Sequence, residues 1–134
     1  MPIRVLLADD TDVMRTAIVF LLKEESSIQV VGEASSFAQT VQMIADLKPD
    51  VLVLDLHMPE KRNLSPVLVK AQFASVDHVL AVSFSNDDEA KILAESYGAA
   101  GLLDKMNLYS ELIPAIKRRL SNPTKPPLQK AALA

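Results

Sequence analysis

The chain of 134 residues contains no cysteine and only three glycines. Without cysteine it cannot form a disulfide, use a thiolate nucleophile or bind zinc through sulfur. The glycines, Gly32, Gly98 and Gly101, are too few to form a glycine-rich phosphate-binding loop. Any phosphate that this chain binds must therefore be held by other groups.

The sequence also lacks a long hydrophobic run and an excess of basic residues. No apolar run approaches the roughly 18 residues that a membrane span needs. The first strand-like run leads directly into Asp9-Asp10, which is not typical of a signal peptide, so we expect a cytoplasmic protein. The net charge of −3 disfavours nucleic-acid binding by this domain. The single basic cluster, Lys117-Arg118-Arg119, falls where a helix should end and complements its dipole.

Short apolar runs alternate with segments of helical periodicity along the chain. Hydrophobic residues make up 49% of the sequence, enough for the core of one globular domain. The apolar runs predict strands buried on both faces, as in a parallel sheet, at residues 3–8, 28–32, 51–54, 79–82 and 100–103. This alternation predicts a doubly wound α/β domain, (βα)5, with helices on both faces of the sheet, over residues 1–120.

Several residues at the expected helix ends agree with this assignment. Ser36 and Gln39 have the spacing of a capping box, and Asn86 and Glu89 resemble one. Gly98 stands where a helix should end, which suits a left-handed cap.

Proline marks three further boundaries. Ser65 followed by Pro66 fits an N-cap with proline at the first helical position. Pro114 lies inside the apolar pattern of the last helix, so we expect that helix to begin near Ser110 and keep Pro114 in its first turn. Residues 121–134 have the composition of a proline-rich linker or tail, either disordered or leading to an output domain absent from this chain.

Polar side chains that can do chemistry follow four of the five predicted strands. In open α/β sheets, ligands bind beyond the carboxyl ends of the strands. The residues at these positions are Asp9, Asp10, Asp55, Ser83 and Lys105. Each alone is more often a cap, a turn residue or a surface charge. Three carboxylates at one edge, however, raise one another's pKa unless a cation lies among them.

Mg²⁺ is the cation that suits an all-oxygen cluster, because zinc or copper would call for Cys or His ligands. A carboxylate beside Mg²⁺, an ammonium group and a hydroxyl can accept a phosphoryl group. Asp55, at the end of the central strand, is the candidate nucleophile. Asp9 and Asp10 are the candidate metal ligands, and no organic cofactor is expected.

Four segments resemble the receiver domain of two-component response regulators. They are Leu7-Ala8-Asp9-Asp10, Val53-Leu54-Asp55-Leu56-His57-Met58-Pro59, Val82-Ser83 and Gly98-Ala99-Ala100-Gly101-Leu102-Leu103-Asp104-Lys105. The resemblance spans residues 1–120 and contains the signature positions of the family in order. Val30-Val31-Gly32-Glu33-Ala34 also resembles the subgroup whose receiver precedes a helix-turn-helix DNA-binding domain.

The resemblance implies a flavodoxin-like receiver fold with strand order 2-1-3-4-5. It implies that a histidine kinase or phosphotransfer protein phosphorylates Asp55. Mg²⁺ would be bound by Asp10, Asp55 and the backbone carbonyl of His57, with Asp9 acting through water.

The resemblance also implies how the signal leaves the site. Lys105 would pair with the phosphoryl group, and the hydroxyl of Ser83 would turn toward it. The surface formed by the fourth helix, the fifth strand and the fifth helix would then change, often with homodimerisation, and control a DNA-binding domain that is not in this chain. The protein would be a signalling switch and not an enzyme with an external substrate.

The sequence departs from the family pattern at three places. Leu102 stands where many receivers have an aromatic residue, and Met106 stands where many have proline. Residues 60–63 contain no glycine, which leaves Asn63 as the candidate for a positive φ.

Three alternatives stay open beside the phosphorylated switch. The first is a receiver that acts unphosphorylated as a protein-interaction module. The second is a phosphatase or phosphotransferase that uses Asp55, although such enzymes carry a second Asp where this chain has His57. The third is a flavin-binding protein, which the aromatic content of 4% disfavours. The side chain of His57 either tunes dephosphorylation or plays no part, and His78 is assigned no role.

Overall fold

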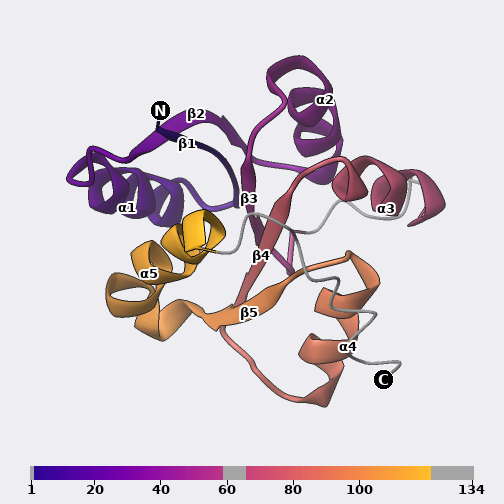
Figure 1. Ribbon diagram of the computed structural model, residues 1–134. Coiled ribbons are helices and arrows are strands. Elements are labelled where there is room, and N and C mark those ends of the chain that lie inside the picture. Colours follow the sequence, from indigo (N-terminus) through magenta and orange to yellow (C-terminus); the bar gives the residue numbers. More distant parts are fainter. Residues whose placement is uncertain (1, 59–65, 122–134) are drawn as a thin grey trace.

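The computed structural model describes residues 2–58 and 66–121 (Figure 1). Five parallel strands form one sheet in the order β2-β1-β3-β4-β5. The strands are β1 (Ile3–Ala8), β2 (Ile28–Ala34), β3 (Val51–Asp55), β4 (His78–Ser83) and β5 (Gly101–Asp104). The doubly wound α/β fold that the sequence pattern predicted and the strand order that the resemblance implied are both confirmed.

Helices cover both faces of the sheet (Figure 1). One face is covered by α1 (Asp12–Lys23) and α5 (Leu108–Ser121), which follows a short 3-10 helix, η1 (Lys105–Asn107). The other face is covered by α2 (Phe37–Leu47), α3 (Pro66–Ala74) and α4 (Asp88–Ser96). Right-handed crossovers between parallel strands produce this arrangement.

The core has two halves, one on each face of the sheet. Along β3, Leu52 and Leu54 point into the half under α2, α3 and α4. Val51 and Val53 point into the half under α1 and α5, because successive strand residues face opposite sides. All five residues of β3 are buried, which explains why its apolar run is continuous and not alternating.

The strands extend slightly beyond their apolar runs. β2 continues to Ala34, which pairs with Ala8 after an irregularity in the register near Val5 and Leu6. β4 begins at His78, which pairs with Val51. Main-chain pairing with a neighbour, and not hydrophobicity, therefore decides where these strands end.

Two of the predicted helix caps have the expected geometry. The hydroxyl of Ser36 accepts a hydrogen bond from the Gln39 amide at 3.1 Å, as the predicted cap requires. The Gln39 side chain accepts from the amide of Ser35, one residue before the cap, at 2.7 Å. Gly98, just beyond α4, has a φ of 76°. Lys48 closes α2 with a φ of 49°, a left-handed cap that the sequence did not indicate.

The predicted cap of α4 is wrong by one residue. Asp87, not Asn86, is the N-cap, and its carboxylate accepts a hydrogen bond from the Ala90 amide at 2.9 Å. A carboxylate at this position also interacts favourably with the positive end of the helix dipole, which the neutral amide of Asn86 does not.

The predicted start of the last helix is also wrong. α5 begins at Leu108, so Pro114 lies inside the helix and not in its first turn. An interior proline costs about 3 kcal/mol. Burial of Leu108 and Leu112 against the sheet, worth about 1.5–3 kcal/mol for each side chain, offsets this cost. Packing of the helix face therefore outweighs the local preference.

Some predictions fall on segments outside the described residues. α3 begins at Pro66 as expected, but the predicted cap Ser65 lies outside them. So do Asn63 and the predicted tail from residue 122 onward.

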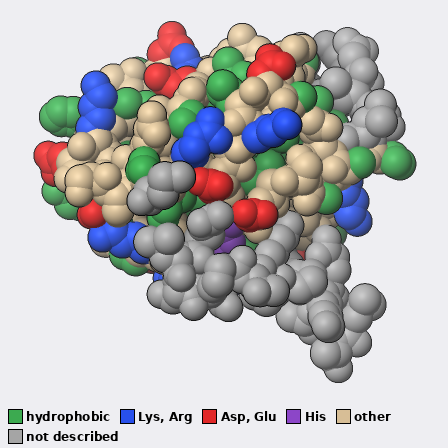
Figure 2. Space-filling model, turned by 45° about the horizontal axis from the view of Figure 1, so that its top comes forward, with side chains coloured by type: hydrophobic (Ala, Val, Ile, Leu, Met, Phe, Trp, Pro, Cys, Tyr) green, Lys and Arg blue, Asp and Glu red, His purple; other side chains and the backbone are tan. Residues whose placement is uncertain are grey.

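Two further expectations concern the surface. None of the helices in the described ranges is long and apolar enough to cross a membrane. On the described part of the face drawn in Figure 2, basic and acidic side chains are intermingled, and no continuous basic surface is present there.

Candidate functional site

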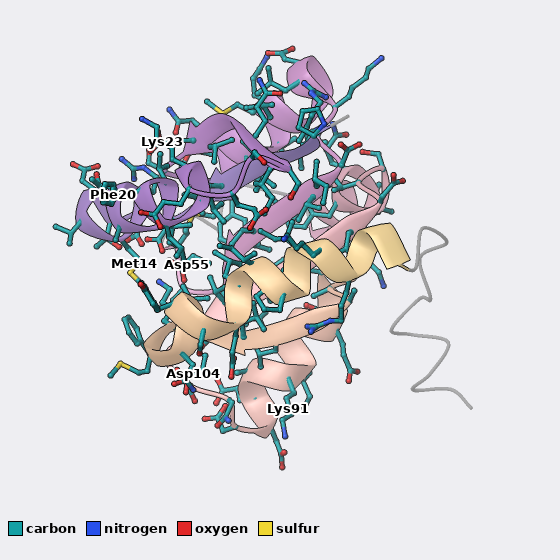
Figure 3. All side chains as sticks on the ribbon, turned by 60° about the vertical axis from the view of Figure 1, so that its left-hand side comes forward. Met14, Phe20, Lys23, Asp55, Lys91 and Asp104 are labelled. Atoms are coloured by element: carbon teal, nitrogen blue, oxygen red, sulfur yellow. The ribbon has the colours of Figure 1, made fainter. Side chains whose placement is uncertain are left out.

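The polar residues that follow the strands meet at the carboxyl edge of the sheet. They are Asp9 and Asp10 after β1, Asp55 at the end of β3, Ser83 at the end of β4 and Lys105 after β5. Parallel strands all end at the same edge, so residues distant in the sequence become neighbours there. Figure 3 shows Asp55 on the same side of the molecule as Met14, in the first turn of α1, and Asp104, at the end of β5.

The ammonium group of Lys105 lies between two buried carboxylates. Its Nζ is 3.0 Å from Asp9 Oδ2 and 3.3 Å from Asp55 Oδ1. All three side chains are almost completely buried. Buried charges are unfavourable unless they are paired, so the ammonium group compensates for bringing the two carboxylates together. The ring of Phe84 covers the Lys105 ammonium at 5.1 Å from its centroid.

The two oxygens of Asp9 have different surroundings. Oδ1 accepts hydrogen bonds from the Thr11 amide at 2.9 Å and from the Thr11 hydroxyl at 2.6 Å. Oδ2 is buried and accepts no hydrogen bond from the described residues, and it forms an ion pair with Lys105. An oxygen of this kind retains a lone pair for a cation.

The geometry fits a hard divalent cation. Carboxylate oxygens of Asp9, Asp10 and Asp55 lie within 4.8 Å of one another. Asp10 is exposed, so the cluster opens toward solvent on one side, which suits the water ligands that Mg²⁺ retains. Oδ2 of Asp9, which accepts no hydrogen bond from the described residues, is a carboxylate oxygen of the kind that Mg²⁺ prefers.

Burial raises the pKa of the Asp55 carboxyl above its ordinary value of 3.8, and the negative charge of Asp9 raises it further. Two donors act against this shift: the His57 amide, which donates to Oδ1 at 3.0 Å, and the Lys105 ammonium. A divalent cation beside these oxygens would favour the ionised, nucleophilic form.

The hydroxyl of Ser83 is buried and has two partners. Its Oγ accepts a hydrogen bond from the Ser85 amide at 3.0 Å. It also lies 2.9 Å from Nε2 of His57, whose side chain reaches across from the loop after β3. Pairing of Asp55 with Val82 places this loop beside the end of β4. The sequence left the role of the His57 side chain open, because only this register brings it to Ser83.

A family model described as the response regulator receiver domain matches residues 5–117. The chain belongs to this family. Response regulator GacA of Pseudomonas viridiflava is 33% identical over 115 residues, which are 86% of this chain and 54% of that protein. Nitrate/nitrite response regulator protein NarL of Escherichia coli is 32% identical over 115 residues, which are 86% of this chain and 53% of that protein.

This receiver domain also resembles solved structures. The signal receiver domain of the putative response regulator NarL from Mycobacterium tuberculosis superimposes with a TM-score of 0.78 at 28% identity. The match covers 90% of this chain and 98% of that one. By contrast, the chain spans about half the length of the curated relatives that it matches.

Leu102 and the two tyrosines nearest to it in the sequence have different surroundings. Leu102 is half-buried and packs against the core under α4. The ring of Tyr97 lies 5.6 Å from the ring centroids of both Phe37 and Phe73, and burial raises the pKa of its hydroxyl. Tyr109 is 85% exposed. Tyr97 is thus part of the core, and Tyr109 points to solvent.

Arg15 contacts the turn that carries Asp9 and Asp10, and the sequence did not indicate this contact. Nη1 of Arg15 donates to the backbone carbonyl of Asp9 at 2.7 Å, and its guanidinium pairs with Asp12 and, at 3.5 Å, with Glu33. Arg15 therefore ties the first turn of α1 and the end of β2 to the Asp9-Asp10 turn. No motif marks it, because the contact depends on how α1 packs beside β2.

Proposed function

We propose that this receiver domain is a phosphorylatable switch in a two-component system, located in the cytoplasm. Asp55 accepts a phosphoryl group from a histidine kinase or a phosphotransfer protein. Mg²⁺ is held by Asp9, Asp10 and Asp55, together with the backbone carbonyl of His57. The observation that carries the proposal is the grouping of three carboxylates at one edge, two of them in contact with the ammonium of Lys105.

The proposed reaction is an in-line phosphoryl transfer. A carboxylate oxygen of Asp55 attacks phosphorus, the new O–P bond forms, and the P–N bond to the donor imidazole breaks. Lys105, 3.3 Å from Asp55 Oδ1, pairs with an oxygen of the transferred group. Ser83, at the end of the neighbouring strand, donates its hydroxyl to another. Bound Mg²⁺ supplies neutralisation of the charge on the phosphoryl oxygens.

The output of the switch is part of the proposal. Addition of about two negative charges at the sheet edge favours one of two arrangements of α4, β5 and α5, and so changes homodimerisation. A DNA-binding domain beyond this chain is the proposed effector. The resemblance of residues 30–34 to receivers that precede such domains supports it, as does the fact that GacA and NarL are about twice as long as the matched segment.

The proposal treats the domain as a switch and not as an enzyme with an external substrate. One relative, protein-glutamate methylesterase/protein-glutamine glutaminase 5 of Myxococcus xanthus, is named for an enzymatic activity. The matched segment covers only 30% of that relative, at 34% identity over 105 residues. The catalytic part of the proposed role is therefore restricted to assisting the chain's own phosphorylation and dephosphorylation.

Intact-mass spectrometry after incubation with Mg²⁺ and acetyl phosphate tests the proposal. We expect a mass gain of one phosphoryl group, lost in Asp55→Asn. A mass gain that persists in Asp55→Asn contradicts the assignment of Asp55, and no gain in the unchanged chain favours an interaction module that acts unphosphorylated. Steady hydrolysis of an aryl phosphate that depends on Asp55 would instead support a phosphatase.

A further inference from the structure

The hydroxyl of Ser83 connects two loops beside Asp55. It is held from one side by the amide of Ser85, in the loop after β4, and from the other by Nε2 of His57, in the loop after β3. Ser83 is fully buried, whereas His57 is exposed and brings an imidazole from the surface to this hydroxyl. A buried hydroxyl with two partners has a defined orientation.

The two roles of the hydroxyl compete because it must turn away from His57 to reach a phosphoryl group. It has one proton to donate, and phosphoryl oxygens only accept hydrogen bonds. If the proton points to an unprotonated Nε2 of His57, it must be withdrawn before Ser83 can donate to a phosphoryl group. If Nε2 carries the proton and donates to Oγ, movement of Ser83 leaves the imidazole without this acceptor. In both tautomers, turning Ser83 away breaks its bond to His57.

The surroundings of Ser83 support this coupling. Phe84, the residue after Ser83, is 63% exposed and lies over the Lys105 ammonium. Among the described residues, the polar groups that contact the Ser83 hydroxyl are the Ser85 amide and the His57 imidazole.

We propose that His57 is a positioning residue that holds the Ser83 hydroxyl in the resting domain and releases it when Asp55 is phosphorylated. The proposal rests on the proposed function of Asp55. It assigns the His57 side chain a role as the resting partner of the switch hydroxyl. It also predicts that phosphorylation is sensed at the loop after β3, through loss of this bond.

A double-mutant cycle with a phosphoryl mimic tests the coupling. Beryllofluoride is titrated with Mg²⁺ into the unchanged chain, His57→Ala, His57→Gln, Ser83→Ala and the His57→Ala/Ser83→Ala double variant, and binding is followed by amide NMR. Because one hydrogen bond is lost on activation, we expect His57→Ala to lower the midpoint about twofold to tenfold. His57→Gln, which keeps a side-chain hydrogen-bonding group, should retain most of the original midpoint.

The Ser83→Ala background distinguishes a His57 that holds the Ser83 hydroxyl from a His57 that only restricts access to Asp55. Without the hydroxyl, His57→Ala should leave the midpoint unchanged. An equal effect of His57→Ala in both backgrounds overturns the proposal and indicates that the imidazole acts by restricting access. No effect of His57→Ala in either background overturns it as well.

The imidazole signal of His57 provides a second readout. The chain has only two histidines, and His78→Gln removes the other signal. Ser83→Ala should shift the Nε2 resonance of His57 in the resting domain, and saturating beryllofluoride should shift the unchanged chain in the same direction. An unchanged Nε2 resonance contradicts the proposal. Failure of acetyl phosphate to modify Asp55 overturns the proposed function too, whereas modification with independent His57 and Ser83 effects overturns only the coupling.

Discussion

The carboxyl group of Asp55 is almost completely buried, and this burial raises its pKa. The ammonium of Lys105 and the amide of His57 compensate only in part for the lost hydration. Ionisation of Asp55 therefore makes the fold less stable. At this scale the site stores unfavourable electrostatic free energy, which a cation or a covalent phosphoryl group can relieve.

This raised pKa predicts a pH-dependent stability difference between the unchanged chain and Asp55→Asn. The native state binds the Asp55 proton more tightly than the unfolded chain, so stability falls as pH rises from 3.8 through the native pKa. Asparagine removes this penalty. Urea unfolding should therefore show Asp55→Asn to be the more stable form at pH 7, with the difference shrinking as the pH falls toward 3.8. A difference that grows on acidification contradicts the assigned direction of the pKa shift.

At the scale of elements, a side chain at Gly32 would crowd the contact between α2 and the sheet. A Cβ at Gly32 in β2 would lie 2.8 Å from Leu47 Cδ1 of α2 and 3.2 Å from Leu6 Cδ1 of β1. Gly32→Ala should therefore lower the free energy of unfolding by about 1 kcal/mol in urea. Gly101→Ala in β5 is the matched control, because its Cβ would meet only Leu80 Cδ2 at 3.7 Å, an ordinary contact. Equal effects of the two changes would contradict the argument from close packing.

The interior proline of α5 predicts a stabilising substitution. Pro114 is exposed and lacks the N–H that an interior helical residue donates. Pro114→Ala should raise the free energy of unfolding by about 1–3 kcal/mol, after allowance for the more flexible unfolded chain. Pro66→Ala, at the first position of α3, serves as control and should give no gain, since no helical bond is missing there. Calorimetry measures both, and a loss of stability in Pro114→Ala would contradict the prediction.

At the scale of the whole molecule, Mg²⁺ should stabilise the fold because the carboxylate cluster exists only in the folded chain. A concentration 100 times the dissociation constant corresponds to about 2.7 kcal/mol. Tm measured against Mg²⁺ concentration should rise, and Asp10→Asn should lose most of the rise. Lys105→Ala should keep it, since the ammonium is not a ligand. A Tm that is independent of Mg²⁺ would contradict the inference that the cluster binds a cation.

Much of this molecule follows from local pattern, and the departures have identifiable causes. The strands and their sheet were predictable because continuous apolar runs have few places to be buried other than a covered parallel sheet. The cap at Asp87 and the start at Leu108 were not, because several adjacent residues suit a helix end and tertiary packing selects among them. The contacts of Arg15 and of the His57 ring were invisible to the sequence because they depend on packing between separate elements.

The sequence by itself determined the fold class, the approximate positions of the strands and the polar residues that follow them, since these depend on hydrophobic periodicity along the chain. Only the tertiary structure decided which side chains touch. Lys105 lies between Asp9 and Asp55, Oδ2 of Asp9 remains without a hydrogen bond, and His57 reaches Ser83. The physical reason is that hydrogen bonds and ion pairs are lost when the distance between their atoms grows by a fraction of an ångström to an ångström. Strand register and helix packing set those distances, and both are relations between segments that lie far apart in the sequence.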